Sequence, residues 1–168
     1  GIGDKHVPWI HNVKNTDLIT AIDDNDVVAI TRLFNEPEGQ AFLAKLGVPA
    51  DTISNLHLMG FSGIANMLSA IKMAKYYNMT SKDVLLIVLT DSMELYNTRI
   101  DEYRQDTGPF TLTNAAETYA ASLMGESTDN MLELSEFERK RVHNLKYYTW
   151  VEQQGRTYEE ILAQWDDP

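Results

Sequence analysis

Two short segments of this chain carry residue types suited to chemistry. The first, Gly60-Phe61-Ser62-Gly63, places a glycine-flanked serine at the start of a helical pattern. The second, Thr90-Asp91-Ser92, is a polar turn that follows six consecutive apolar residues, 84–89. Helix N-termini and the carboxyl ends of strands are the places where α/β proteins bind phosphates and cofactors. We therefore take Gly60, Ser62, Thr90 and Asp91 as candidate cofactor-binding residues.

The elements that must position these residues follow from the hydrophobic pattern. Apolar residues recur at helical spacing from Ser62 to Tyr77, which predicts an amphipathic helix. The run 84–89 is mostly β-branched or leucine, as is typical of strands that are covered on both faces in a parallel sheet. A shorter β-type run covers 18–22, and the carboxylates of 23–26 supply N-caps for a helix. The pattern predicts the α/β class.

Ser62 has two compatible roles. The simpler one is helix capping, in which its hydroxyl accepts a hydrogen bond from a backbone amide. The same hydroxyl can also hydrogen-bond the ring nitrogen of a flat aromatic cofactor, because it carries two lone pairs and one donor. Lys72 and Lys75 lie in the amphipathic helix, where we expect solvated side chains.

The order of these motifs resembles the cysteine synthase and tryptophan synthase β class of pyridoxal-phosphate enzymes. That family carries Gly-Ile-Ser-Ser-Gly-Ala-Ala before a helix, then an apolar strand that ends in Pro-Ser or Pro-Asp-Ser, and a Gly-Ile-Gly loop further upstream. This chain has Gly1-Ile2-Gly3, then Gly60–Ala65, then 86–96, in the same order. The resemblance covers about residues 1–104.

The resemblance implies a role for each matching residue. Ser62, preceded by Gly60, would contact the pyridine nitrogen of pyridoxal 5'-phosphate, and Thr90 and Asp91 would lie beside the ring. Gly1 and Gly3 would line the substrate side of the cofactor. The chain departs from the family pattern at Gly63, which replaces the second serine, and at Thr90, which replaces a proline.

The resemblance also implies a fold and a domain organisation. Residues 1–105 would form the C-terminal part of the larger domain of a fold type II enzyme, a three-layer sandwich built on a parallel sheet. The residues themselves, and not the resemblance, predict a boundary near Gly108-Pro109 and an all-helical extension without strands over 106–168, which short cysteine synthases lack. Helix starts in this extension are indicated by capping-box spacings. These are Asn114 with Glu117, Ser135 with Glu138, and Thr157 with Glu160.

A neutral serine at the ring nitrogen favours particular chemistry. It does not hold a proton there as a carboxylate would, so the ring is a weaker electron sink and β-replacement or β-elimination is favoured over transamination. The expected enzyme is a lyase or transferase of amino-acid metabolism that acts on a substrate such as activated serine. In the family, the cofactor-binding lysine and the phosphate loop lie N-terminal to this region. We therefore expect no catalytic residue in this segment.

Composition narrows the possible partners. The net charge of −11 disfavours nucleic acid, and 43% hydrophobic residues suffice for a core. The absence of cysteine is compatible with a cytoplasmic protein, and no apolar run is long enough to span a membrane. The four histidines match no usual metal pair, so no metal is expected.

The chain begins at Gly1 without methionine, and we read it as a segment of a longer polypeptide. The expected partners are a small amino-acid substrate, the N-terminal remainder of the same chain, and a second copy in a homodimer. The alternative is a non-catalytic α/β binding or regulatory module. A nucleotide-binding Rossmann half is disfavoured, because no Gly-x-Gly-x-x-Gly follows a strand.

Overall fold

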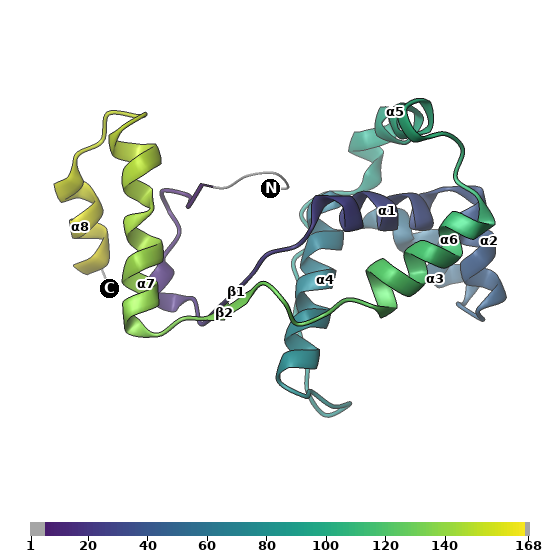
Figure 1. Ribbon diagram of the computed structural model, residues 1–168, viewed down its shortest axis with the longest axis horizontal. Helices are drawn as coiled ribbons and strands as arrows, with labels where there is room; N and C mark the ends of the chain where they lie inside the picture. The colour runs from purple at the N-terminus through teal and green to yellow at the C-terminus, as the bar shows by residue number, and fades with distance from the viewer. Residues whose placement is uncertain (1–5, 167–168) are drawn as a thin grey trace. The chain divides into compact units, whose positions relative to one another are not determined.

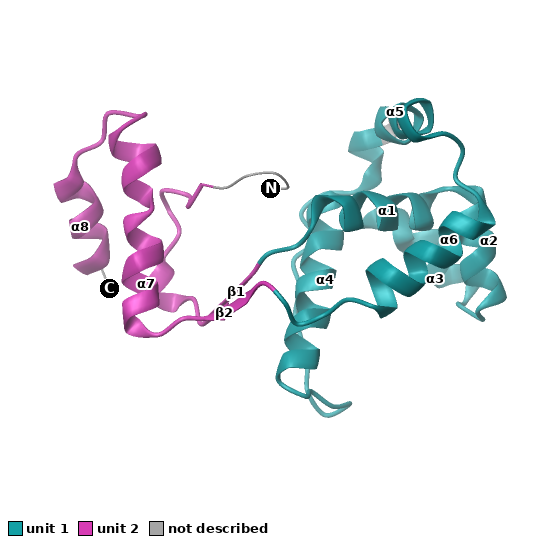
Figure 2. Cartoon of the chain, in the orientation of Figure 1, with its two compact units in different colours: residues 1–2, 21–129 teal, residues 3–20, 130–168 magenta. Residues whose placement is uncertain are grey.

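The computed structural model describes residues 6–166, which fall into two compact units (Figure 2). Of these residues, unit 1 contains 21–129, and unit 2 combines 6–20 with 130–166. The units are described separately below. The predicted functional boundary between residues 105 and 106 stays a prediction.

Unit 1 is a helical body (Figure 1). Its α-helices are α1 (Asp24–Asn35), α2 (Pro37–Lys45), α3 (Ala50–Asn55), α4 (Phe61–Tyr76), α5 (Asn97–Thr107) and α6 (Leu112–Thr118). Single 3₁₀ turns at Leu56–Leu58 and Met93–Tyr96 and a π-helical turn at Tyr119–Met124 complete it. The predicted helix over 62–77 is confirmed as α4. The predicted N-cap of α1 is also confirmed, since the Asp23 carboxylate accepts a hydrogen bond from the Asn25 amide at 2.8 Å.

The core of unit 1 forms where the apolar stripes of its helices meet. Burying such side chains stabilises the fold by roughly 1.5–3 kcal/mol each. The fully or nearly buried members are Val27, Ile30, Leu33, Phe34, Leu43, Phe61, Ile64, Leu68, Phe110 and Ala115. Phe61 and Ile64 belong to the first turns of α4, so the core fixes the start of this helix, where the candidate site residues lie.

Unit 2 joins the two ends of the described chain. Strand β1 (Leu18–Thr20) pairs with β2 (Met131–Glu133) in antiparallel register, with Ile19 opposite Leu132. Helices α7 (Glu136–Asn144) and α8 (Tyr158–Asp166) follow, separated by a π-helical turn at Tyr147–Val151. A 3₁₀ turn at Val13–Asn15 packs beside α7, and Val13, Leu134 and Val142 form a small core.

The prediction of a parallel-sheet three-layer sandwich is wrong. The structure is 62% helical, and the described residues contain only the two-stranded antiparallel sheet. The run 84–89, which the sequence predicts as a buried strand, has no regular secondary structure and is largely exposed: Val84 is 87% and Leu86 is 93% accessible. A strand needs a neighbour for its backbone N–H and C=O groups. Within the described chain, β1 pairs with β2, and no strand pairs with 84–89.

The prediction of an all-helical, strand-free extension is also wrong, because β2 lies at Met131–Glu133. Two of its three predicted helix starts are confirmed. Ser135 caps α7 through the Glu138 amide, and Thr157 and Glu160 hydrogen-bond reciprocally at the start of α8. The third start lies earlier than predicted, since Thr111 is the N-cap of α6 and Asn114 is its partner.

Helical spacing after Ser135 also predicts that Phe137, Leu145 and Tyr148 form a packing stripe on that helix. This stripe does not form within the described chain. Phe137 is 72% exposed, Tyr148 59% and Leu145 48%. None of the described helices is long and apolar enough to cross a membrane.

Candidate functional site

Gly60, rather than Ser62, is the N-cap of α4. Its backbone is extended, with φ −74° and ψ −175°, and the helix begins at Phe61. Ser62 therefore lies one residue further, in the first turn of α4, where it is half-buried. The predicted capping role of Ser62 is wrong, but its predicted position at a helix N-terminus is confirmed.

The start of α4 contacts the turn that contains Asp91. The Gly60 amide donates a hydrogen bond to the Asp91 carbonyl at 3.0 Å. A Cβ atom on Gly60 would lie 2.4 Å from Asp91 Oδ1 and 3.0 Å from the Asp91 carbonyl oxygen, so a larger residue would push the two apart. The structure thus brings together the two candidate segments, which are separated by about thirty residues in the sequence.

The chain that precedes Asp91 runs along α4. The Asn66 side-chain amide donates to the Val88 carbonyl at 2.8 Å, and a Cβ atom on Gly63 would meet the Leu89 side chain at 3.2 Å. These contacts hold residues 88–91 against the first two turns of the helix. They fix the direction from which Thr90 and Asp91 approach the start of α4.

Each oxygen of the Asp91 carboxylate accepts a hydrogen bond from a hydroxyl group. The Tyr96 hydroxyl donates to Oδ2, and the Thr90 hydroxyl, on an otherwise exposed residue, donates to Oδ1 at 3.2 Å. The hydrogen bond to Asp91 raises the pKa of the Tyr96 hydroxyl above its usual range. The Tyr96 ring packs edge-on against the buried ring of Phe61, with centroids 5.0 Å apart. Asp91 is therefore held in place from both sides of the turn.

Tyr96 was not among the residues predicted for the site. Its only signal in the sequence is its position five residues after Asp91, in a segment that matches the start of the family's next helix. That spacing does not reveal a hydroxyl–carboxylate contact. The role of Tyr96 becomes visible only when the 3₁₀ turn Met93–Tyr96 brings it back toward Asp91.

The Ser62 hydroxyl, in the first turn of α4, is available for a hydrogen bond to a ligand. No other residue in the part of the chain that the structure describes forms a hydrogen bond with it. The first turn of α4 holds no acidic side chain, but the Asp91 carboxylate already lies at this helix end. The Asp91 carboxylate would repel a second anion at this helix end, whereas it would not repel a neutral ring nitrogen. The Asp91 carboxylate at this helix end therefore disfavours an anionic group such as a phosphate there.

The other candidates separate into two groups. Gly1 and Gly3, which were predicted to line the substrate side, lie outside the described residues. Of the two helix lysines predicted to be solvated, Lys72 is in fact buried and forms ion pairs with Glu126 and Asp129 at 3.0 and 2.8 Å. Amphipathic spacing alone missed this, because both carboxylates lie more than fifty residues further along the chain.

No protein-family model, curated protein or solved structure matches this sequence. We therefore infer function from the residues and their contacts.

Proposed function

We propose that this chain is the C-terminal part of a pyridoxal-phosphate enzyme of the cysteine synthase class, which catalyses β-replacement or β-elimination on an amino acid such as activated serine. The observation that supports it most is the hydrogen bond between the Gly60 amide and the Asp91 carbonyl. It brings the Ser62 turn and the Thr90–Asp91 turn together, as the resemblance implies for the two sides of the cofactor ring.

Each residue has a distinct role in this proposal. The Ser62 hydroxyl would donate a hydrogen bond to the ring nitrogen while keeping its proton, and Gly60 lets the Asp91 turn approach the helix without a steric clash. Tyr96 and Thr90 keep the Asp91 carboxylate hydrogen-bonded, so the ring nitrogen meets a neutral donor rather than a free carboxylate. When bound, the cofactor supplies the electron sink for chemistry at the substrate's α- and β-carbons.

The remaining parts of the site come from outside the described residues. The N-terminal remainder of the chain supplies the lysine that binds the cofactor covalently and the loop that binds its phosphate. The resemblance assigns the substrate side of the cofactor to Gly1 and Gly3. We further propose a cytoplasmic homodimer, with no metal and no nucleic-acid partner.

The second candidate is a non-catalytic binding or regulatory module. It is favoured by the mostly helical unit 1, in which the contacts of Asp91 with Gly60 and Tyr96 would serve only to pack the chain. The two candidates differ in whether the complete gene product holds pyridoxal phosphate.

The test is cofactor binding by the complete gene product, followed by its visible absorption spectrum. We expect a band of lysine-bound cofactor in the complete protein and none in the 168-residue chain alone. Ser62→Ala should keep the band but weaken cofactor binding by about 0.5–1.5 kcal/mol, the value of one neutral hydrogen bond. Ser54→Ala, which removes an exposed hydroxyl bonded to the Asp51 carbonyl, is the control and should leave affinity unchanged. A complete protein that binds no cofactor would favour the binding module.

Ser62→Asp tests the role assigned to the neutral hydroxyl. A carboxylate at the ring nitrogen would favour its protonated form and so increase transamination-type side products. Product analysis by mass spectrometry measures that ratio. A product ratio equal to that of the unmodified protein, with cofactor still bound, would place Ser62 away from the ring.

A further inference from the structure

Two of the lysines that the structure describes, Lys72 and Lys146, are buried, and they differ in how their charge is balanced. Lys72, in unit 1, is 3% exposed and lies within 3.0 Å of the carboxylates of Glu126 and Asp129. Lys146, in unit 2, is 1% exposed and forms no ion pair with any carboxylate among residues 6–166. A buried charge without a partner of opposite sign is costly, so the surroundings of Lys146 need an explanation.

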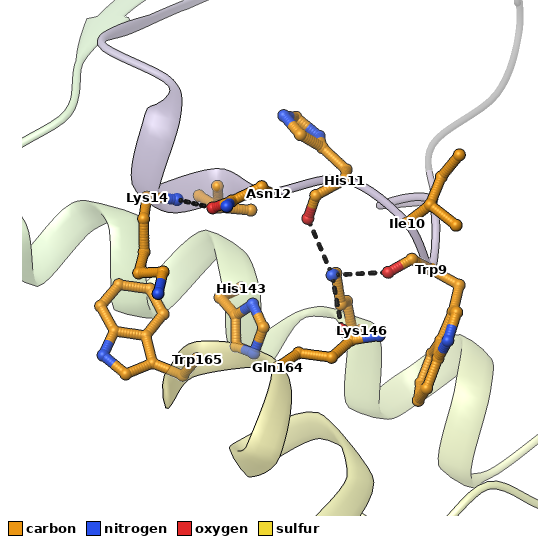
Figure 3. A pocket seen from close by; sticks show the side chains of 10 residues that line it. Trp9, Ile10, His11, Asn12, Lys14, His143, Lys146, Gln164 and Trp165 are labelled. Carbon is orange, nitrogen blue, oxygen red and sulfur yellow. Dashed lines mark hydrogen bonds between the residues drawn. The ribbon is translucent and has the colours of Figure 1, made fainter. Parts of the chain in front are cut away.

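The Lys146 ammonium group is held by three neutral oxygens (Figure 3). It donates to the carbonyls of Trp9 and His11 at 2.9 Å each and to Gln164 Oε1 at 2.8 Å. Burial lowers the pKa of Lys146 below its usual range. The first two acceptors are backbone carbonyl oxygens of one loop, so neither can move away from the ammonium group without moving the loop. The third is a half-buried side-chain amide on α8, which can move by rotating its own bonds.

A cavity of about 330 Å³ lies beside this ammonium group. Its titratable lining residues are His11, Lys14, His143 and Lys146, and its described lining includes no aspartate or glutamate. The indole rings of Trp9 and Trp165 form part of its wall (Figure 3). Although the chain has a net charge of −11, all the described titratable side chains that line this cavity are basic.

We propose that this cavity binds a small oxyanion, a phosphate or the carboxylate of a small metabolite, with the Lys146 ammonium group as its principal charge. Rotation of the Gln164 side chain frees one ammonium proton, which the oxyanion accepts in a stronger, charge-assisted hydrogen bond. The site lies wholly within unit 2 and does not depend on the function proposed for the Ser62 region.

The first experiment titrates the 168-residue chain with inorganic phosphate, and separately with acetate, against chloride at matched ionic strength. Tryptophan fluorescence and backbone amide NMR shifts report binding. We expect a saturable response whose shifts cluster on 9–14, 143–146 and 164–165. A response no larger than that of chloride, or one that clusters elsewhere, would overturn the proposal. Phosphate and acetate compared with each other identify the preferred oxyanion.

Two matched variants test the role of Lys146. Gln164→Glu places a carboxylate where the amide oxygen now accepts a hydrogen bond from Lys146. This carboxylate would pair with the Lys146 ammonium group in place of the oxyanion, so saturable phosphate binding should be lost. Ala163→Glu adds the same charge at the exposed neighbouring position and should bind phosphate as the unmodified chain does. Equal phosphate binding by both folded variants would contradict the proposal. Circular dichroism checks folding, and the titration of the unmodified chain remains decisive if Gln164→Glu does not fold.

Discussion

His143 illustrates how burial changes the chemistry of a single residue. It is 4% exposed, its Nε2 lies 2.8 Å from the Ile161 carbonyl oxygen, and its ring packs edge-on against Trp165. Burial lowers the pKa of His143, and although the Ile161 carbonyl opposes this shift, the nearby Lys146 charge adds to it. Burial and the Lys146 charge lower the pKa of His11 in the same way. The folded protein therefore binds protons at these residues less readily than the unfolded chain.

This difference predicts that acid destabilises the protein. The unfolded histidines take up protons as pH falls below about 6.5, while the folded ones do so only at lower pH. Stability is therefore present above that value and is lost progressively below it. Thermal unfolding between pH 7.5 and 5.5 measures the slope. His143→Gln, which keeps a side-chain donor but cannot titrate, should flatten it, whereas the neighbouring Asn144→Gln should not. An equal slope in both variants would show that His143 does not contribute.

Individual site residues could be predicted from the sequence only where they belong to a local pattern. Ser62 and Gly60 were found because a helix start has a recognisable composition, and Asp91 because it ends an apolar run. Tyr96 and Lys146 were missed because their partners are set by tertiary contacts. Lys146 bonds to carbonyls more than 130 residues away, and backbone carbonyls leave no signature in a sequence.

At the scale of elements, the contact between α4 and the Asp91 turn depends on Gly60. We predict that Gly60→Ala destabilises the protein by roughly 1–3 kcal/mol, the range found for overpacking. The reason is that a Cβ atom would lie 2.4 Å from Asp91 Oδ1 and would break the Gly60–Asp91 hydrogen bond. Denaturant unfolding followed by circular dichroism measures this change.

Gly63→Ala is the matched control in the same helical turn. Its added Cβ atom would lie 3.2 Å from the movable end of the Leu89 side chain and 3.7 Å from Met59 Cβ, which is an ordinary contact distance. Alanine also favours the helix by about 0.5–1 kcal/mol. We therefore expect a net change under about 1 kcal/mol. If both variants lose the same stability, the close approach at Gly60 is not what holds the Asp91 turn in place.

Helices could be predicted from the sequence more reliably than strands. The hydrogen bonds of α4 close within the segment itself, so periodicity and caps suffice to locate it. A strand at 84–89 would need a neighbouring strand to pair with, which no local pattern specifies and which the described chain does not provide. The same limit applies to β1 and β2: the run 18–22 was recognised as β-type, but its antiparallel partner at 131–133 was not.

At the scale of the whole molecule, the exposed apolar run 84–89 predicts self-association of the isolated chain. Val84, Leu86 and Val88 are 87%, 93% and 66% exposed, and apolar segments with unpaired backbone invite pairing with other chains. Leu86→Lys should reduce association by placing a charge in the middle of the run. Sedimentation velocity over a range of protein concentrations measures this. Ser81→Lys adds the same charge outside the run, and an equal reduction by both variants would point to net charge instead.

Unit 2 is assembled from both ends of the described chain, so the sequence of unit 1 lies between its two parts. This arrangement has a consequence for biosynthesis. Thr20 cannot meet Met131 until the 110 residues between them have left the ribosome. Closing an unstructured loop of that length costs about 4 kcal/mol in chain entropy. The described residues of unit 1, 21–129, all lie within that interval, so unit 1 can fold first and bring residues 21 and 129 together. We therefore expect unit 2 to be the last part of the nascent chain to become protease-resistant.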